Sequence, residues 1–229
     1  MKLFSDRRHA GRALAQGLAE YGGRADAVVL GLPRGGIPVA YEVATALRAP
    51  LDVLTVRKIG APWNPEFAIG ALASGGMTYI DEATATQLGV RPDEIEATIA
   101  LEREELARRE QLYRGTRPFP NLQGRTVIVV DDGLATGSTM RAAVQAVRTE
   151  HPHEVIAAAP VASREACNVL AIVADRCVCA ATPEPFYGVG LWYEDFSPTS
   201  DEEVLDLLAR SHQEQAPKVD SPDGVRERI

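Results

Sequence analysis

Short, continuous apolar runs recur along this chain, and most of them are separated by stretches with helical spacing of apolar residues. An apolar run without polar alternation is typical of a strand buried on both faces, as in a parallel sheet. Strands that alternate with helices predict an α/β domain, with helices packed on a parallel sheet and ligand sites at the carboxyl ends of the strands. The predicted strands are residues 27–32, 51–56, 127–130, 155–160 and 176–181, and the predicted helices are residues 5–21, 37–48, 140–147 and 163–174.

Residues 57–114 depart from this alternation. Residues 57–66 are rich in glycine, proline and other turn formers, which predicts a loop, and residues 67–80 follow as a hairpin around Gly75-Gly76. Residues 82–114 predict an inserted helical arm, since opposite charges recur at i,i+4 spacing and Pro92 suits a first helical turn. The apolar positions of this arm are sparse, so only one narrow face is expected to pack.

The chain contains no internal repeat, and its 229 residues suit one well-buried domain. We expect this domain to cover residues 1–211. Residues 212–229 are polar and include Pro217 and Pro222, which predicts a disordered tail.

Charge and cysteine usage exclude several classes of protein. A net charge of −8 argues against bulk attraction to nucleic acid or to an acidic membrane, so a polyanion site must gather its cations locally. No apolar run approaches the roughly 20 residues that span a bilayer, and the first residues lack the apolar core of a signal peptide.

Three cysteines make no disulfide framework, and a reducing cytoplasm is expected. Cys177 and Cys179 form a C-x-C pair without a nearby third or fourth ligand, which is a poor zinc site and suggests filler.

Residues 127–139 carry the strongest chemical signal. Four β-branched apolar residues end in Asp131 and Asp132, and a run of small residues with two glycines precedes a predicted helix. A strand, a tight turn and a helix start direct free backbone N–H groups and the positive end of the helix dipole at one spot, which favours an anion. Ser138 or Thr139 is the expected N-cap.

The two acids restrict which anion can bind. They would repel a free phosphate unless they hold another part of the same ligand, and ribose hydroxyls and Mg²⁺ both suit carboxylate oxygens. A phosphorylated sugar is therefore favoured. A P-loop is excluded because no lysine precedes Ser138, and the G-x-G-x-x-G dinucleotide fingerprint is absent.

This stretch resembles the phosphoribosyl pyrophosphate (PRPP) motif of the type I phosphoribosyltransferases, in which four apolar residues and two acids precede a small-residue loop. The resemblance implies a Rossmann-like core with a small hood, dependence on Mg²⁺ and a homodimer. It also implies that Asp131 and Asp132, the acidic pair, bind the ribose hydroxyls, with Mg²⁺ held through those hydroxyls or through water. The 5′-phosphate would lie on a phosphate loop formed by Ala135, Thr136, Gly137, Ser138 and Thr139.

Two further segments take roles from the same resemblance. In this family, a loop after a strand binds pyrophosphate and contains a non-proline cis peptide; here that loop would be Pro33, Arg34, Gly35 and Gly36, with the cis bond at Pro33–Arg34. Arg57 and Lys58 begin the stretch that corresponds to a mobile loop closing over PRPP, so they are expected to neutralise the departing pyrophosphate. A plain turn and a basic surface loop are the open alternatives for these two segments.

Residues 182–200 are dense in aromatic side chains and correspond to the hood that holds the acceptor. Phe186 or Tyr187 would stack on the acceptor, and core packing of the same aromatics is an equal alternative. The basic residues Arg7, Arg8 and Arg12 of the first predicted helix are interpreted as a solvated face rather than as a phosphate site.

The leading hypothesis is a cytoplasmic, Mg²⁺-dependent phosphoribosyltransferase of nucleotide metabolism. It would move the 5-phosphoribosyl group of PRPP to a nitrogen acceptor, expected to be a nucleobase, and release pyrophosphate, with Asp131, Asp132, Arg57 and Lys58 as catalytic residues. Its partners would be PRPP, a small-molecule acceptor and a second copy of the chain, with no nucleic acid and no membrane. The alternative is a non-catalytic regulator that senses PRPP or a nucleotide and needs no loop for pyrophosphate release.

Overall fold

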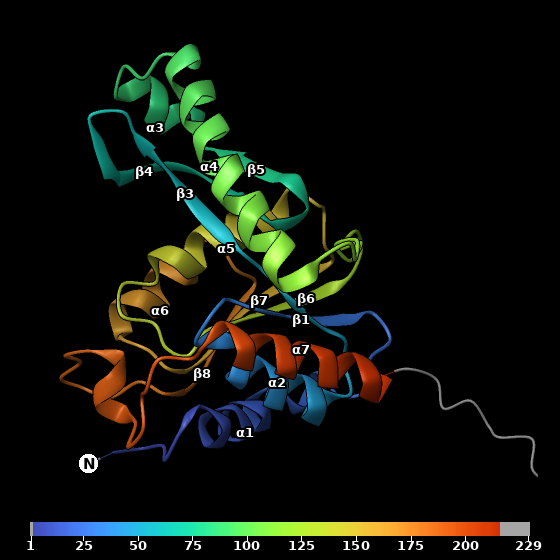
Figure 1. The fold of residues 1–229 in the computed structure, drawn as a ribbon. Coiled ribbons are helices and arrows are strands. Elements are labelled where there is room, and N and C mark those ends of the chain that lie inside the picture. The colour runs from blue at the N-terminus through green and yellow to red at the C-terminus, as the bar shows by residue number, and fades with distance from the viewer. Residues whose placement is uncertain (1, 216–229) are drawn as a thin grey trace, which may run out of the picture.

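The computed structural model describes residues 2–215. Its centre is a five-stranded sheet in which all neighbouring strands are parallel, in the order β2-β1-β6-β7-β8 (Figure 1). The predicted parallel α/β sheet is therefore confirmed, and each of its strands falls on a predicted apolar run. The strands are β1 (Ala27–Gly31), β2 (Leu51–Val53), β6 (Thr126–Val130), β7 (Glu154–Val161) and β8 (Arg176–Ala181).

Helices cover both faces of this sheet. One face carries α1 (Arg7–Gly17), α2 (Gly36–Leu47) and α7 (Asp201–Gln215), and the other carries α5 (Ser138–Arg148) and α6 (Arg164–Leu170). Alternate strand residues supply the two cores, since Val29 and Ile128 pack with the first group of helices, whereas Val28 and Val127 pack with the second. Because strand side chains alternate between faces, one continuous apolar run fills both layers.

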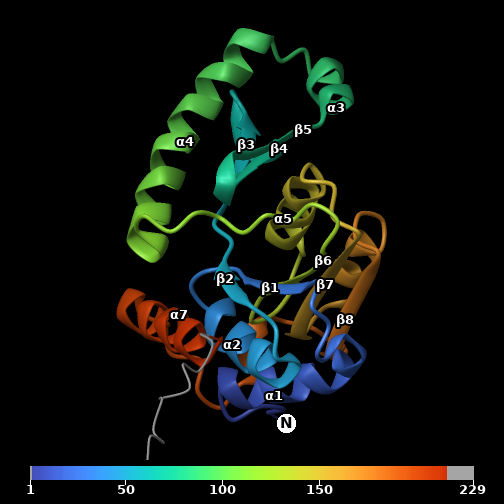
Figure 2. The same cartoon turned by 90° about the vertical axis from the view of Figure 1, so that its right-hand side faces the viewer.

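A second, antiparallel sheet projects beyond the parallel one and carries the arm (Figure 2). Its strands are β3 (Val56–Ala61), β4 (Asn64–Ala73) and β5 (Met77–Ile80), and the arm consists of α3 (Glu82–Gln87) and α4 (Pro92–Arg114). Ile59, Leu72 and Leu106 belong to one buried cluster between these strands and the arm. As expected, α4 has few buried residues, namely Leu106, Tyr113 and Arg114.

The loop predicted over residues 57–66 is instead the β3–β4 hairpin. The predicted strand at residues 51–56 accordingly divides into β2 and the start of β3. Ile59 and Ile69 are both buried in the cluster beneath the arm. Burial of these side chains in the tertiary structure outweighs the turn-forming composition of residues 57–66. The local sequence pattern contains no information about that burial.

The last described helix, α7, extends past the predicted domain boundary at residue 211. Residues 212–215, expected to be disordered, are helical, and the rest of the predicted tail, residues 216–229, lies outside the described residues. Between residues 2 and 215, no helix is both long enough and apolar enough to cross a membrane.

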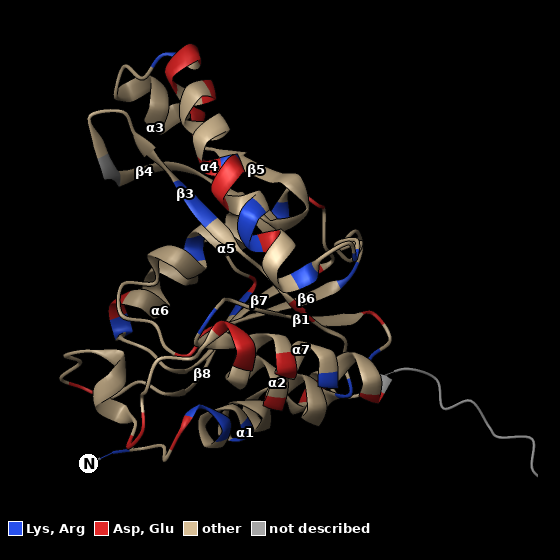
Figure 3. Ribbon diagram, in the orientation of Figure 1, with Lys and Arg blue, Asp and Glu red and all other residues tan. Residues whose placement is uncertain are grey.

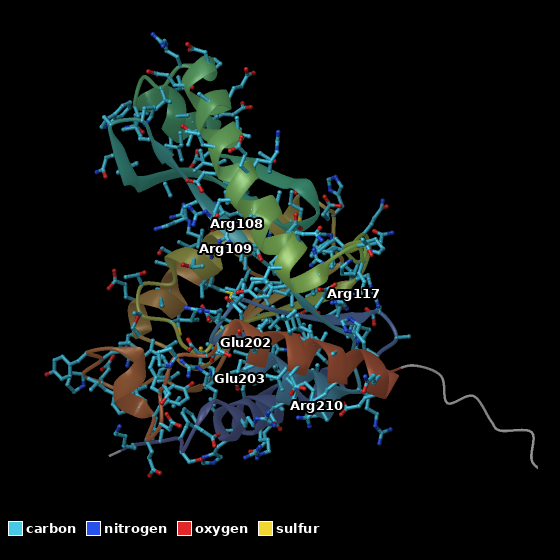
Figure 4. All side chains as sticks on the ribbon, in the orientation of Figure 1. Arg108, Arg109, Arg117, Glu202, Glu203 and Arg210 are labelled. Atoms are coloured by element: carbon cyan, nitrogen blue, oxygen red, sulfur yellow. The ribbon has the colours of Figure 1, made fainter. Side chains whose placement is uncertain are left out.

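Polar contacts tie α7 to the base of the arm. Tyr113 Oη donates to Asp201 Oδ1 at 2.5 Å, and Arg117 Nη1 lies 2.7 Å from His212 Nδ1. Figure 4 shows Arg117 next to α7, on the connection that follows α4. Of these two contacts, the one between Arg117 and His212 lies beyond the predicted boundary at residue 211.

Candidate functional site

Two turns meet at the carboxyl end of the parallel sheet, one after β1 and one after β6. Because β1 and β6 are parallel neighbours, both turns leave the sheet at the same edge. A Cβ atom on Gly35 would lie 2.0 Å from Asp132 Oδ2, and one on Gly36 would lie 2.7 Å from Val130 O. Both positions therefore require glycine for the backbone to approach the acidic pair. The peptide bond Pro33–Arg34 is cis, as the resemblance implied.

Short polar contacts hold the acidic pair in place. Asp131 Oδ1 accepts a hydrogen bond from the backbone N–H of Asp132 at 2.8 Å, and Arg7 Nε donates to Asp132 Oδ2 at 2.9 Å. Tyr193 Oη donates to the backbone carbonyl of Asp132 at 2.5 Å. One oxygen of each carboxylate is thus engaged within the protein, and the second oxygen of each can accept from a ligand.

Arg7 and Tyr193 are site residues that the sequence interpretation missed. The Arg7 side chain is only 12% exposed, lies 4.0 Å above the Phe196 ring and donates to the carbonyl of Ser197 at 2.7 Å. The preferred interpretation of Arg7 as part of a solvated face is therefore wrong. No local pattern could have singled it out, because its partners lie more than a hundred residues further along the chain.

Burial perturbs both acids of the site. Loss of solvation raises the pKa of Asp131 well above its ordinary value, and the neighbouring Asp132 charge adds to the rise. Burial also raises the pKa of Asp132, although the charge of Arg7 opposes it. The pair consequently retains a proton at a pH where an isolated aspartate would have lost it.

The phosphate loop forms the start of α5. Gly137 is the N-cap, with φ at 72°, and Ser138 is the first helical residue, so the predicted cap at Ser138 or Thr139 is wrong. Only glycine adopts that left-handed conformation without steric cost, and the resulting turn presents the first N–H groups of α5 to the loop. Ser163 Oγ donates to Ala135 O at 2.5 Å and braces the loop from the α6 side.

A cavity of about 440 Å³ separates the phosphate loop from the antiparallel sheet. Thr136, Ser138 and Arg141 line it on the α5 side, and Lys58 and Tyr79 line it on the other side. Two cations therefore border the predicted 5′-phosphate position. Arg141 lies one turn into α5 and was not predicted, although its place just after the motif could have identified it.

Arg57 and Lys58 do not act from the same side. Successive residues of a strand face opposite ways, and β3 lies between α4 and α5 (Figure 3). Lys58 lines the cavity, whereas Arg57 Nε lies 2.6 Å from Glu102 Oε2 on the arm. The strand geometry thus separates the two side chains, and the expectation that both cations meet pyrophosphate stays a prediction.

The hood packs over the acidic pair and over the turn that follows it. A Cβ atom on Gly133 would lie 2.3 Å from Val189 Cγ1. Of the two predicted acceptor residues, Phe186 packs against Trp192 with ring centroids 6.3 Å apart, and Tyr187 is 80% exposed. Phe186 thus contributes to the apolar packing of the hood, while Tyr187 is accessible to a ligand. The exposed Arg34 lies outside the hood, in the turn after β1.

Replacing Gly35 with alanine is expected to lower the free energy of unfolding by about 2 kcal/mol, because the new methyl group overlaps the Asp132 carboxylate. Chemical denaturation would measure the loss. Gly17→Ala is the matched control: its added Cβ meets only a Val178 methyl group at 3.1 Å, and alanine favours the helix. Equal stability of the two variants would contradict the close approach at Gly35.

Replacing Asp131 with asparagine is expected to stabilise the folded protein at neutral pH. Since burial raises the folded-state pKa, the stabilisation from this carboxyl is complete below the unfolded-state pKa and is lost as the pH rises through the raised folded-state pKa. Asparagine mimics the protonated form, so its melting temperature should exceed the wild-type value by ~2–4 °C at about pH 8. The difference should vanish near pH 3, below the ordinary aspartate pKa of about 3.9. A variant that melts at or below the wild type at neutral pH would refute the raised pKa.

Comparison with known proteins relates this chain to phosphoribosyl transferases. The model of the phosphoribosyl transferase domain matches residues 6–184. The chain is 44% identical over 216 residues to Rv0571c of Mycobacterium tuberculosis (strain ATCC 25618 / H37Rv), whose name assigns phosphoribosyl transfer only provisionally. That match covers 94% of this chain and 48% of the relative, so the chain spans about half the length of the curated relatives it matches.

Two further similarities were found. The crystal structure of TT1426 from Thermus thermophilus is 44% identical, with a TM-score of 0.84, and the match covers 92% of this chain and 99% of that chain. The bifunctional protein PyrR of Ralstonia nicotianae is 35% identical over 94 residues, which cover 40% of this chain and 52% of that protein. The chain thus shares its fold with the TT1426 structure.

Proposed function

We propose that this chain, which belongs to the phosphoribosyl transferase domain family, transfers the 5-phosphoribosyl group of PRPP to a nitrogen acceptor and releases pyrophosphate. The observation that carries the proposal is the position of the acidic pair, which lies between the glycine turn after β1 and the phosphate loop at the start of α5. A diol-binding pair of carboxylates beside an anion-binding helix start suits a phosphorylated ribose.

The chemistry is a substitution at the anomeric carbon of the ribose, with positive charge developing on the sugar ring as pyrophosphate leaves. The phosphate loop and Arg141 hold the 5′-phosphate, and the acidic pair holds the ring hydroxyls and offsets part of the developing charge. Lys58 and the turn containing Arg34 neutralise the leaving group. Closure of the antiparallel sheet over the cavity would exclude water from the reactive carbon.

The donor set of the acidic pair fits Mg²⁺. This ion is usually held by one or two carboxylates together with substrate oxygens and water, and Asp131 and Asp132 each have a second oxygen besides the one engaged within the protein. We therefore include Mg²⁺ in the proposal, bound through the ribose hydroxyls or through water. When bound with PRPP, it would supply further neutralisation of the phosphate charges.

A nucleobase is the acceptor we propose, bound beneath the hood, with Tyr187 as the accessible aromatic side chain that can stack on it. We also propose a homodimer that works in the cytoplasm, where the free thiols of its three cysteines would stay reduced. Gel filtration with light scattering would test the dimer.

One observation favours a sensor as the second candidate function. Arg57, one of the two cations expected to meet pyrophosphate, is paired with Glu102 on the arm. A protein that binds PRPP without turning it over would need only the acidic pair and the phosphate loop.

The deciding experiment incubates the protein with PRPP and Mg²⁺ against a panel of purine and pyrimidine bases and measures pyrophosphate. Release that depends on one base supports the transferase, and release without a base would indicate hydrolysis instead. If no base gives pyrophosphate while calorimetry shows PRPP binding at about micromolar Kd, the sensor replaces the enzyme. Absence of PRPP binding under these conditions would exclude both.

A further inference from the structure

Three cysteine sulfurs converge on the side of the parallel sheet that carries α5 and α6. Cys167 comes from α6, and Cys177 and Cys179 come from β8. The Sγ atom of Cys179 lies 3.8 Å from that of Cys167 and 3.9 Å from that of Cys177. All three sulfurs lie within 4.8 Å of one another.

The sequence pattern alone suggested filler, because the C-x-C pair had no visible third ligand. The fold supplies that ligand. Cys177 and Cys179 are two residues apart on a strand and so face the same side of the sheet. Their register partners on β7 are Ala157 and Ala159. The helix α6 packs over the same side and brings Cys167 to them. The interpretation as filler therefore rested on the absence of a ligand that the fold provides.

We propose that Cys167, Cys177 and Cys179 form a three-thiolate site for a thiophilic d¹⁰ metal ion, with Zn²⁺ as the representative. Tetrahedral Zn²⁺ with Zn–S bonds of about 2.3 Å requires sulfurs about 3.8 Å apart, which agrees with the two short Sγ distances. Thiolates are the ligands that select such soft ions over Mg²⁺. With three protein ligands, the fourth position is open to water.

Accessibility and charge suit an exchangeable site. All three cysteines are half-buried, so an ion can enter without unfolding of the sheet. Binding displaces the thiol protons into solvent, and three thiolates with one divalent ion leave a net charge of −1. Arg164 begins the same helix three residues before Cys167, and its guanidinium is paired with Glu184, with Nε 2.5 Å from Glu184 Oε1.

The metal site would stabilise α6, the helix that packs against the phosphate loop. The residue before Cys167, Ala166, lies against the loop, since a Cβ atom on Gly137 would be 3.3 Å from the Ala166 Cβ. Ser163, the N-cap of α6, donates to Ala135 O within the loop. A metal ion that joins α6 to β8 is therefore expected to stabilise the folded protein as well as to bind.

The test uses the reduced, metal-free full-length protein and Co²⁺ as a spectroscopic probe. We expect one equivalent per chain to give sulfur-to-cobalt charge-transfer absorption and the visible bands of tetrahedral cobalt, and Zn²⁺ to displace it. Each of Cys167→Ser, Cys177→Ser and Cys179→Ser should weaken Zn²⁺ binding by at least about tenfold. Zn²⁺ should raise the melting temperature of the wild type and not that of Cys177→Ser.

A matched control removes two imidazole side chains that could also bind Co²⁺, His151 and His153, which lie on the connection between α5 and β7. The double variant His151→Ala/His153→Ala should bind Co²⁺ as the wild type does. The proposal is overturned if the triple cysteine variant still binds or if the reduced wild type gives no saturable cobalt spectrum. It is also overturned if thiol counting shows that two cysteines form a disulfide in preference to binding metal. None of these measurements involves PRPP, so failure here leaves the proposed transferase untouched.

Discussion

Replacing Asp131 and Asp132 together with asparagine is expected to lower kcat/KM for PRPP at least about a thousandfold, equivalent to ~4 kcal/mol of transition-state stabilisation. The change keeps the shape of both side chains and removes the charge that, in the proposed function, holds the ribose hydroxyls and Mg²⁺. At least about tenfold of the loss should appear as weaker PRPP binding. The remainder should appear in kcat, because the charge on the sugar ring develops only in the transition state.

Isothermal calorimetry with PRPP and Mg²⁺ separates the binding part from the turnover part. The control is Asp93→Asn with Glu94→Gln, a second adjacent acidic pair, which lies in the first turn of α4. This control should bind PRPP as the wild type does. Wild-type affinity in the Asp131/Asp132 variant would remove the acidic pair from the ribose site.

Lys58→Ala is expected to slow pyrophosphate release by roughly a hundredfold, ~2.7 kcal/mol, while PRPP binding weakens much less. The physical reason is that Lys58 lines the cavity beside the phosphate loop and, in the proposed function, neutralises a leaving group whose charge grows in the transition state. Arg57→Ala is the neighbouring control on the same strand. Since Arg57 is paired with Glu102 on the arm, its loss should slow turnover less than loss of Lys58.

Steady-state rates of both variants, together with Kd values from calorimetry, test this difference. Equal losses of kcat would mean that Arg57 leaves Glu102 and joins Lys58 when PRPP binds, and Glu102→Gln should then raise turnover rather than lower it. If Lys58→Ala loses affinity for PRPP but retains its kcat, Lys58 contacts PRPP equally in the ground state and in the transition state. A sensor would show this behaviour.

Local sequence was sufficient for the parallel sheet and for the motif at its centre. Apolar runs at β1, β6 and β7 are long enough to be recognised without neighbours, because a strand buried on both faces needs no polar residues. The acidic pair and the phosphate loop are contiguous in sequence, so their chemistry could be inferred from residues 127–139 alone. The glycine turn after β1 was identified in the same way.

Tertiary structure decided everything that depends on residues distant in sequence. It turned residues 57–66 from a predicted loop into a hairpin, because Ile59 and Ile69 gained a core from an arm that follows them in the chain. It separated Lys58 from Arg57 by placing a helix on each side of β3. It also turned residues 212–215 from predicted tail into the end of α7.

The sequence by itself therefore determined the fold class, through short apolar runs that alternate with helical segments, and the acids and backbone turn of the candidate ribose-phosphate site, which lie within residues 127–139. Only the tertiary structure brought Arg7 to the carboxylate of Asp132 and Tyr193 to its backbone carbonyl. It also brought Cys167 to the C-x-C pair. The physical reason is that hydrophobic periodicity and turn chemistry act over a few residues, whereas ion pairs and sulfur clusters form between side chains that only the packed core brings together.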